Sequence, residues 1–127
     1  MTVLNDIYKC DVCGMVIEVV HEGPGELVCC EKPMELLEAV QKEEGGVKHI
    51  PIISVEGNAV KVDVGEIPHP MEKEHWITFI ELCIDDEIFR KSLNPGDEPS
   101  ATFDVNYKDG DIKARIYCNI HGLWPSD

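Results

Sequence analysis

The chain has 127 residues, enough for one ordinary domain or for a small metal-bound module beside a modest hydrophobic core. Its 25 acidic side chains against 11 basic ones give a formal net charge of -14, which argues against binding to nucleic acid or to an anionic membrane surface. No stretch is apolar over the length that a transmembrane helix needs, and no signal-peptide pattern opens the chain, so we expect a soluble, cytoplasmic protein.

Residues 1–36 contain few large apolar side chains, and a segment this short usually needs a metal or disulfides in order to fold. Two pairs of cysteines lie within it: Cys10 and Cys13 are separated by two residues, and Cys29 and Cys30 are adjacent. Clustered cysteines in a reducing compartment more often bind metal than form disulfides. We therefore predict two short β-ribbons folded around one metal ion, with the adjacent pair distorting the tetrahedron.

Tetrahedral sulfur ligation suits zinc and iron alike, and the spacing on its own favours a structural zinc ion. Gly14 gives the backbone room for the turn that carries the first pair. His21 lies in the loop between the pairs, and we interpret it as a solvent-exposed residue rather than a ligand. Residues 33–44 have apolar side chains at mixed helical spacing, which predicts a short helix or an irregular linker. We place the linker between the two modules at residues 37–47.

From residue 48 onward, short β-type segments alternate with turn residues. Residues 49–55 and the alternating valines at 60–64 flank the turn Gly57-Asn58, which predicts a hairpin. Residues 76–84 are apolar on both faces, as expected of a central buried strand. Further strands are predicted at 88–93, 101–107 and 112–118. Roughly six or seven strands at this spacing indicate an antiparallel sandwich or barrel.

Five more potential metal ligands fall in this second segment and do not interleave with the first four. They are His49, His69, His75, Cys118 and His121. A single histidine is more often an ordinary surface residue, but four of them with one cysteine indicate a second metal site. Imidazole suits iron, copper and zinc, and one thiolate among nitrogen ligands argues for a redox role or a tuned Lewis acid. A blue-copper site is disfavoured because no methionine follows His121 and because it would not use four histidines.

Together the motifs resemble those of desulfoferrodoxin, a family of two-iron superoxide reductases, over nearly the whole chain. YKCDVCG at residues 8–14 and LVCC at 27–30 resemble its desulforedoxin-like N-terminal domain. Four further motifs resemble its neelaredoxin-like catalytic domain: KHIP at 48–51, PHPM at 68–71, HW at 75–76 and YCNIHG at 117–122.

The resemblance implies an iron ion held by the four thiolates of residues 1–36, so that the first metal is iron rather than zinc. It also implies an immunoglobulin-like antiparallel β-sandwich at residues 48–127, which holds a second, non-haem iron. The axial ligand of that iron would be Cys118, with the opposite, sixth position open to superoxide. Its equatorial ligands would be His49, His69, His75 and His121.

The family implies an enzyme of oxidative-stress defence that reduces superoxide to hydrogen peroxide with one electron and without release of oxygen. The alternatives are an electron-transfer protein with a closed second site and a zinc-ribbon interaction module with incidental histidines. A homodimer and a rubredoxin-like electron donor are also implied. Many members have a glutamate where this chain has Val47, and that glutamate can close the sixth position of the oxidised iron. We expect water, hydroxide or nothing in that position, and turnover to survive.

Lys48 is the candidate catalytic residue, because a cation about 4 Å from superoxide would contribute on the order of 1–4 kcal/mol of attraction at surface-like dielectric. We expect Trp76 and Trp124 either to shield the edge of the iron or to pack in the core. Cys83 lies in an apolar strand, which predicts a small, buried hydrophobic residue outside both metal sites.

Overall fold

The computed structural model describes residues 2–39 and 46–126. The chain divides into two compact units, Met1–Glu38 and Ala39–Asp127, and both are built of antiparallel strands. Among the described residues there is no helix with the length and apolar character needed to cross a lipid bilayer. The mainly β fold predicted from the sequence is confirmed.

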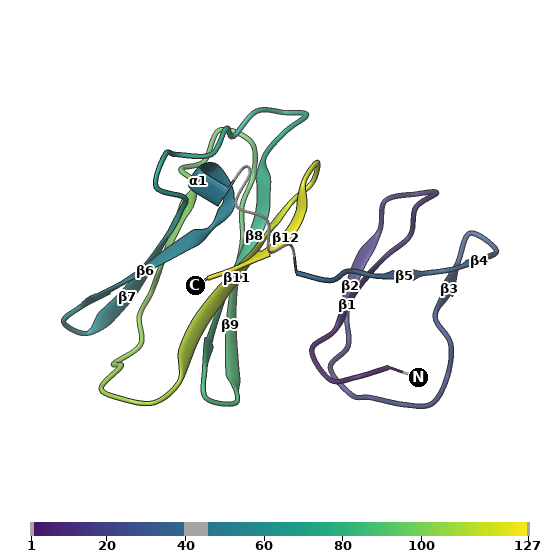
Figure 1. The fold of residues 1–127 in the computed structure, drawn as a ribbon, viewed down its shortest axis with the longest axis horizontal. Coiled ribbons are helices and arrows are strands. Elements are labelled where there is room, and N and C mark those ends of the chain that lie inside the picture. The colour runs from purple at the N-terminus through teal and green to yellow at the C-terminus, as the bar shows by residue number, and fades with distance from the viewer. Residues whose placement is uncertain (1, 40–45, 127) are drawn as a thin grey trace. The chain divides into compact units, whose positions relative to one another are not determined.

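The first unit contains a three-stranded sheet in the order β2-β1-β5 and a two-stranded ribbon of β3 and β4 (Figure 1). Its strands are β1 (Ile7–Lys9), β2 (Val16–Glu18), β3 (Val28–Cys29), β4 (Lys32–Pro33) and β5 (Glu35–Leu36). Ile7 and Cys10 are almost completely buried, whereas Val12 and Val20 are exposed. So small an apolar interior contributes little hydrophobic stabilisation, which leaves the fold dependent on a further source of stability.

The helix proposed as one alternative for residues 33–44 is wrong where the structure describes this stretch. β5 occupies part of it and pairs with β1, with Leu36 opposite Tyr8. Pairing with a neighbouring strand outweighs the weak helical spacing of the apolar side chains, because strand formation depends mainly on such contacts. Residues 40–44 of that prediction lie outside the described residues.

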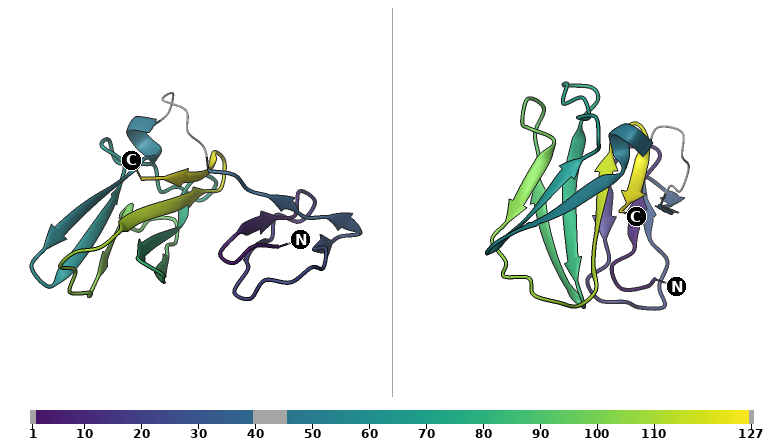
Figure 2. Two further views of the ribbon diagram at one scale, coloured as in Figure 1. Left: turned by 60° about the horizontal axis from the view of Figure 1, so that its bottom comes forward. Right: turned by 60° about the vertical axis from the view of Figure 1, so that its left-hand side comes forward.

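Two antiparallel sheets form the second unit, one in the order β10-β7-β6 and the other in the order β12-β11-β8-β9 (Figure 2). Its elements are α1 (Gly46–His49), β6 (Pro51–Glu56), β7 (Ala59–Val64), β8 (Ile77–Ile84), β9 (Glu87–Ser92), β10 (Ser100–Phe103), β11 (Ile112–Cys118) and β12 (Gly122–Pro125). Alternate residues of both sheets form one core, including Val62 of β7, Ile80 of β8 and Ile116 of β11. The predicted antiparallel sandwich is confirmed.

Several predicted elements of this unit match the structure closely. β6 and β7 form the hairpin around Gly57-Asn58, with Gly57 at a φ of 60°. β8 lies between β11 and β9, as a central strand should. In contrast, His49 ends the short helix α1 instead of opening a strand, and β10 ends at Phe103, well before residue 107. β12 is not predicted from the sequence, because four residues that include Gly122 and Pro125 carry little strand signal.

Candidate metal centres

Four sulfur atoms of the first unit converge on one point. The Sγ atoms of Cys10, Cys13, Cys29 and Cys30 all lie within 4.8 Å of one another. Cys13 Sγ is 3.7 Å from Cys29 Sγ, which is 3.9 Å from Cys30 Sγ. A tetrahedron with metal–sulfur bonds of about 2.3 Å has sulfur–sulfur edges of about 3.8 Å. The four residues predicted to hold the first metal therefore fit around one tetrahedral ion.

Left-handed backbone conformations allow the adjacent cysteines to serve one site. Cys30 and Glu31 have φ values of 53° and 65° and form the two-residue loop between β3 and β4. Tight hairpin loops favour positive φ at both positions, although residues other than Gly, Asn and Asp adopt it at some cost. In the other pair, Gly14 has a φ of 83° and its N–H donates to Cys10 O at 2.9 Å, which closes the turn as predicted.

The four thiols cannot all ionise easily without a cation between them. The backbone N–H of Cys13 donates to Cys10 Sγ at 3.5 Å and is the main reason that the pKa of Cys10 is lowered to about 6. The contact with Cys10 is the main cause that raises the pKa of Cys29 to about 12. The pKa of Cys30 is also raised, first through its contact with Cys13. Each thiolate that forms thus hinders ionisation of the neighbouring thiols, and the positive charge of a bound metal ion would offset this effect.

The second group of predicted ligands converges in the sandwich unit. His49, His69, His75, Cys118 and His121 each place a ligand atom within 4.8 Å of the others. His49 ends α1, His69 and His75 lie in the connection between β7 and β8, and Cys118 ends β11 shortly before His121. Three separate segments of the chain are therefore brought together at one site.

The four imidazoles form a closed ring of neighbours. In the order His49, His69, His75, His121 and back to His49, successive ring centroids are 4.7, 4.7, 5.0 and 4.8 Å apart. Nε2 of His49 is 3.1 Å from both Nε2 of His69 and Nδ1 of His121. Nitrogens at this separation leave room for an ion at roughly 2 Å from each. Cys118 Sγ completes the donor set, 3.7 Å from His121 Nδ1.

Contacts outside the ring of ligands fix the orientation of two of the imidazoles and hold the backbone of a third histidine. His69 donates from Nδ1 to Pro70 O at 2.7 Å, which leaves its Nε2 lone pair directed at His49 Nε2. His49 stacks on the indole of Trp124, with centroids 4.6 Å apart and planes at 14°. Trp124 in turn donates from Nε1 to His121 O at 3.1 Å. Burial lowers the pKa of His69 to about 4, so its ring stays in the neutral form that binds metal.

A buried nitrogen of His75 is evidence that the second site is built to hold a metal ion. Among the described residues, Nε2 of His75 is the buried side-chain polar atom that has no hydrogen-bond partner. Leaving such an atom without a partner costs about 1–3 kcal/mol, and coordination to a metal would remove that cost. Four imidazole nitrogens and one thiolate suit iron and favour redox chemistry. The site therefore fits the second iron ion that the sequence motifs imply.

The site is buried on one side and open on another. Cys118 is completely inaccessible, and His49 and His69 are nearly so. His121 is exposed and His75 is partly exposed. A small molecule from solvent can therefore reach the site past these two imidazoles, while the thiolate stays protected from water.

The connection after β7 holds the backbone of α1 against the site. The N–H of Ile67 donates to Val47 O at 3.0 Å. A Cβ added to Gly65 would lie 2.5 Å from Val47 O and 3.0 Å from Lys48 Cα, so only glycine permits this close approach. The Lys48 side chain is exposed. Lys48 directly precedes the ligand His49, and its charge is a small contribution to the lowered pKa of His75, which burial and then His121 mainly cause.

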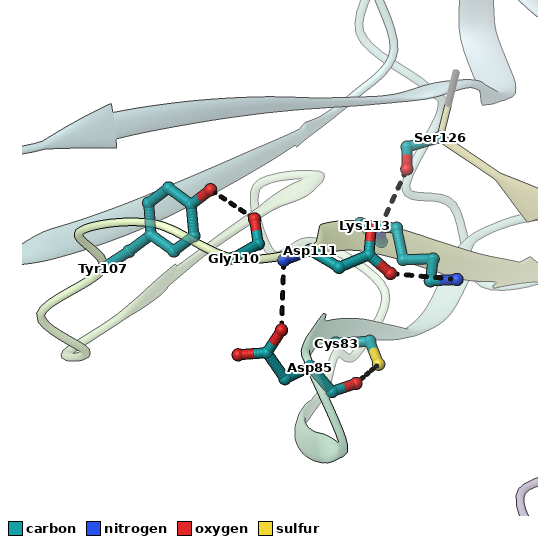
Figure 3. Close-up of polar contacts among 8 residues, drawn as sticks. Cys83, Asp85, Tyr107, Gly110, Asp111, Lys113 and Ser126 are labelled. Carbon is teal, nitrogen blue, oxygen red and sulfur yellow. Dashed lines mark hydrogen bonds and ion pairs between the residues drawn. The ribbon is translucent and has the colours of Figure 1, made fainter.

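The remaining candidates from the sequence lie outside both groups of ligands. His21 is exposed, as predicted. The prediction that Cys83 is buried is wrong: its side chain is partly exposed and its Sγ–H donates to Asp85 O at 3.3 Å (Figure 3). Cys83 lies near the end of β8, on the face opposite the core residues Leu82 and Ile84, which explains its access to solvent.

Both roles proposed for the tryptophans are filled by Trp124. Trp124 both packs in the core and covers His49. Trp76 follows His75 directly, and its Nε1–H donates to a backbone carbonyl at 3.3 Å. Asn119 is not predicted from the sequence as a functional residue, although its side chain contacts the segment that carries His75. Its place between the ligands Cys118 and His121 was the available signal.

Comparisons with known proteins cover both units. The family described as Desulfoferrodoxin matches residues 40–127, and the Desulfoferrodoxin N-terminal domain matches residues 2–37. A desulfoferrodoxin homolog of Methanothermobacter thermautotrophicus is 51% identical over 124 residues, 98% of this chain and 99% of its own. One of Archaeoglobus fulgidus is 52% identical over 126 residues, 99% of each chain. The crystal structure of the superoxide reductase from Treponema pallidum matches 96% of each chain with a TM-score of 0.77 and 26% identity.

Proposed function

The chain belongs to the desulfoferrodoxin family, and from this premise we propose that it is a superoxide reductase that converts superoxide to hydrogen peroxide at the second iron. The observation that carries the proposal is the ring of four imidazoles with one buried thiolate and an open side at His75 and His121. An electron-transfer protein has no need of such an opening, because electrons do not require their donor to enter the site.

The reaction consumes one electron and two protons for each superoxide. When bound, ferrous iron supplies the electron. The backbone N–H of His121 donates to Cys118 Sγ at 3.4 Å and stabilises the thiolate charge on the protected side of the site. The exposed side, at His75 and His121, gives the anion access and allows water to deliver both protons. Val47 is exposed and has no carboxylate, so it offers no ligand atom to a bound iron ion, and we propose that this side of the site stays open to solvent throughout the reaction.

Lys48 is proposed to attract the anionic substrate into a strongly acidic molecule. In Lys48→Ala the association rate constant of superoxide should fall at least about threefold, and its dependence on ionic strength should weaken, because a nearby cation steers encounters. Pulse radiolysis over a range of salt concentrations measures both. Lys108→Ala is the matched control, since Lys108 is exposed in the connection from β10 to β11, which contributes no ligand to either site. An unchanged rate constant in Lys48→Ala would remove the steering role.

Anaerobic purification with metal analysis, followed by pulse radiolysis of the reduced protein, tests the function itself. We expect about two irons per chain, as the two donor sets imply, with thiolate-to-iron absorption and peroxide formed without oxygen. Release of oxygen would indicate dismutation instead. A colourless protein that contains zinc would contradict the proposal and favour an interaction module.

We further propose a cytoplasmic homodimer that takes electrons from a rubredoxin-like donor, with an iron domain at residues 1–36, a linker at 37–47 and a catalytic domain at 48–127. The homodimer is supported by exposed apolar side chains of the first unit, which would be covered by a partner surface. They are Val3, Leu4, Val12, Met15, Val20, Val28 and Leu36. Sedimentation should give two chains per particle; a single chain would contradict the dimer.

A further inference from the structure

His75 occupies the least supported position in the ring of imidazoles. It ends a short turn, in which Glu72 and His75 exchange backbone hydrogen bonds of 2.9 and 3.1 Å. Each of the other three histidines has a further contact. The ring of His69 donates to Pro70 O and the ring of His49 stacks on Trp124, whose Nε1–H donates to the backbone carbonyl of His121. Nε2 of His75 has no hydrogen-bond partner among the described residues. The position of this imidazole therefore depends on where its backbone is held.

Asn119 holds the backbone on both sides of His75. Its Oδ1 accepts a hydrogen bond from the N–H of Trp76 at 2.9 Å, and its Nδ2 donates to Glu74 O, also at 2.9 Å. A backbone contact from Asn119 N to Trp76 O, at 3.3 Å, supports them. One half-buried carboxamide thus satisfies the peptide groups immediately before and after the ligand.

The strand pairing explains why a side chain is needed here. β8 and β11 pair regularly up to Tyr117 opposite Phe79, and then shift register so that Cys118 lies opposite Ile77. Beyond this irregularity the ladder ends, and the carboxamide of Asn119 makes the contacts that a further peptide group would have made. It fixes the distance between the turn that carries His75 and the segment that carries Cys118 and His121.

We propose that Asn119 is a positioning residue that places His75 in the second metal site and thereby sets the metal affinity of that site. The inference rests on the proposed function only in assigning iron chemistry to the site. Residues that orient a ligand typically contribute about 10–100-fold to metal affinity or activity. We expect Asn119→Ala to weaken metal binding at this site by that factor, with the four-cysteine site unaffected.

A double-mutant cycle tests this proposal by measuring the affinity for cobalt(II) instead of the enzymatic activity. Metal-free wild type, Asn119→Ala, His75→Ala and the double variant are titrated, with the thiolate absorption of each site followed separately. Because Asn119 acts through His75, the loss caused by Asn119→Ala should shrink to less than about twofold in the His75→Ala background. Asn58→Ala, the same change in the exposed β6–β7 turn, should leave both affinities unchanged.

Equal losses in both backgrounds would show a general structural effect and overturn the proposal, as would unchanged affinity in Asn119→Ala. If Asn119→Ala does not fold, Asn119→Asp keeps the acceptor for Trp76 N and loses the donor to Glu74 O. Its loss must also vanish in the His75→Ala background. An iron-loaded wild type that failed to reduce superoxide would refute the proposed function while leaving the cobalt result valid.

Discussion

Cys118→Ser is expected to lower the rate constant of superoxide reduction at least about 100-fold, because changes to residues that only support a ligand already cost about 10–100-fold. Cys118 Sγ is fully buried and accepts the backbone N–H of His121 at 3.4 Å. Burial raises the pKa of the Cys118 thiol, while backbone N–H groups oppose the rise. A serine hydroxyl in the same place would keep its proton far more strongly, so the site would lose its anionic ligand.

Pulse radiolysis of the reduced variant measures this loss, and the four-cysteine centre provides an internal reference in the same sample. Its thiolate absorption should be unchanged, because Cys118 belongs to the other unit of the chain. Cys83→Ser is the matched control: it removes a thiol from the neighbouring strand β8, outside both groups of ligands. We expect it to react at the wild-type rate. A Cys118→Ser variant within about threefold of wild type would show that the thiolate is not needed, a far smaller loss than removal of a ligand should cause.

The ligands could be identified from the sequence because cysteine and histidine are few and their donor chemistry is specific. The two groups separate along the chain, and each group belongs to one of the two units. The hairpin around Gly57-Asn58 could also be predicted from the sequence, because its turn residues and alternating valines reflect local geometry.

What the sequence did not reveal depends on contacts between distant segments. β5 forms because β1 offers it a partner, which the spacing of Leu36 and its neighbours does not indicate. The short helix α1 ends at His49, and its placement depends on the close approach of Gly65. Asn119 acquires its role from the register shift between β8 and β11. Local patterns specify residue types and strand periods, but the pairing of distant strands decides what each polar side chain meets.

Glu81 is the clearest example of a polar residue whose contacts are decided by the pairing of distant strands. It lies in the strand predicted to be apolar on both faces, and its side chain is 1% exposed. The register places Arg90 of β9 and Arg115 of β11 directly opposite it on either side. Arg90 Nε donates to Glu81 Oε2 at 2.7 Å, and Arg115 Nε donates to Oε1. The three side chains therefore join three adjacent strands, and β11 is the strand that delivers Cys118 to the site.

Glu81→Ala should lower the free energy of unfolding of the sandwich by about 2–3 kcal/mol, because it removes both charge-assisted hydrogen bonds. Breaking a fully buried ion pair costs about 3–5 kcal/mol, but the side chain of Arg90 is 42% exposed and that of Arg115 25%, so both can turn toward water. Denaturant unfolding followed by tryptophan fluorescence measures the change, since both tryptophans lie in this unit.

Glu87→Ala provides the matched control, because Glu87 is exposed on the same β8–β9 hairpin and its replacement should change stability by less than about 0.5 kcal/mol. Both variants remove one negative charge, so a difference between them isolates the two arginine contacts from the reduction in net charge. Equal stability of Glu81→Ala and Glu87→Ala would mean that desolvation of the buried carboxylate already offsets both hydrogen bonds. In that case the three strands would be held together by their backbone ladder and apolar core alone.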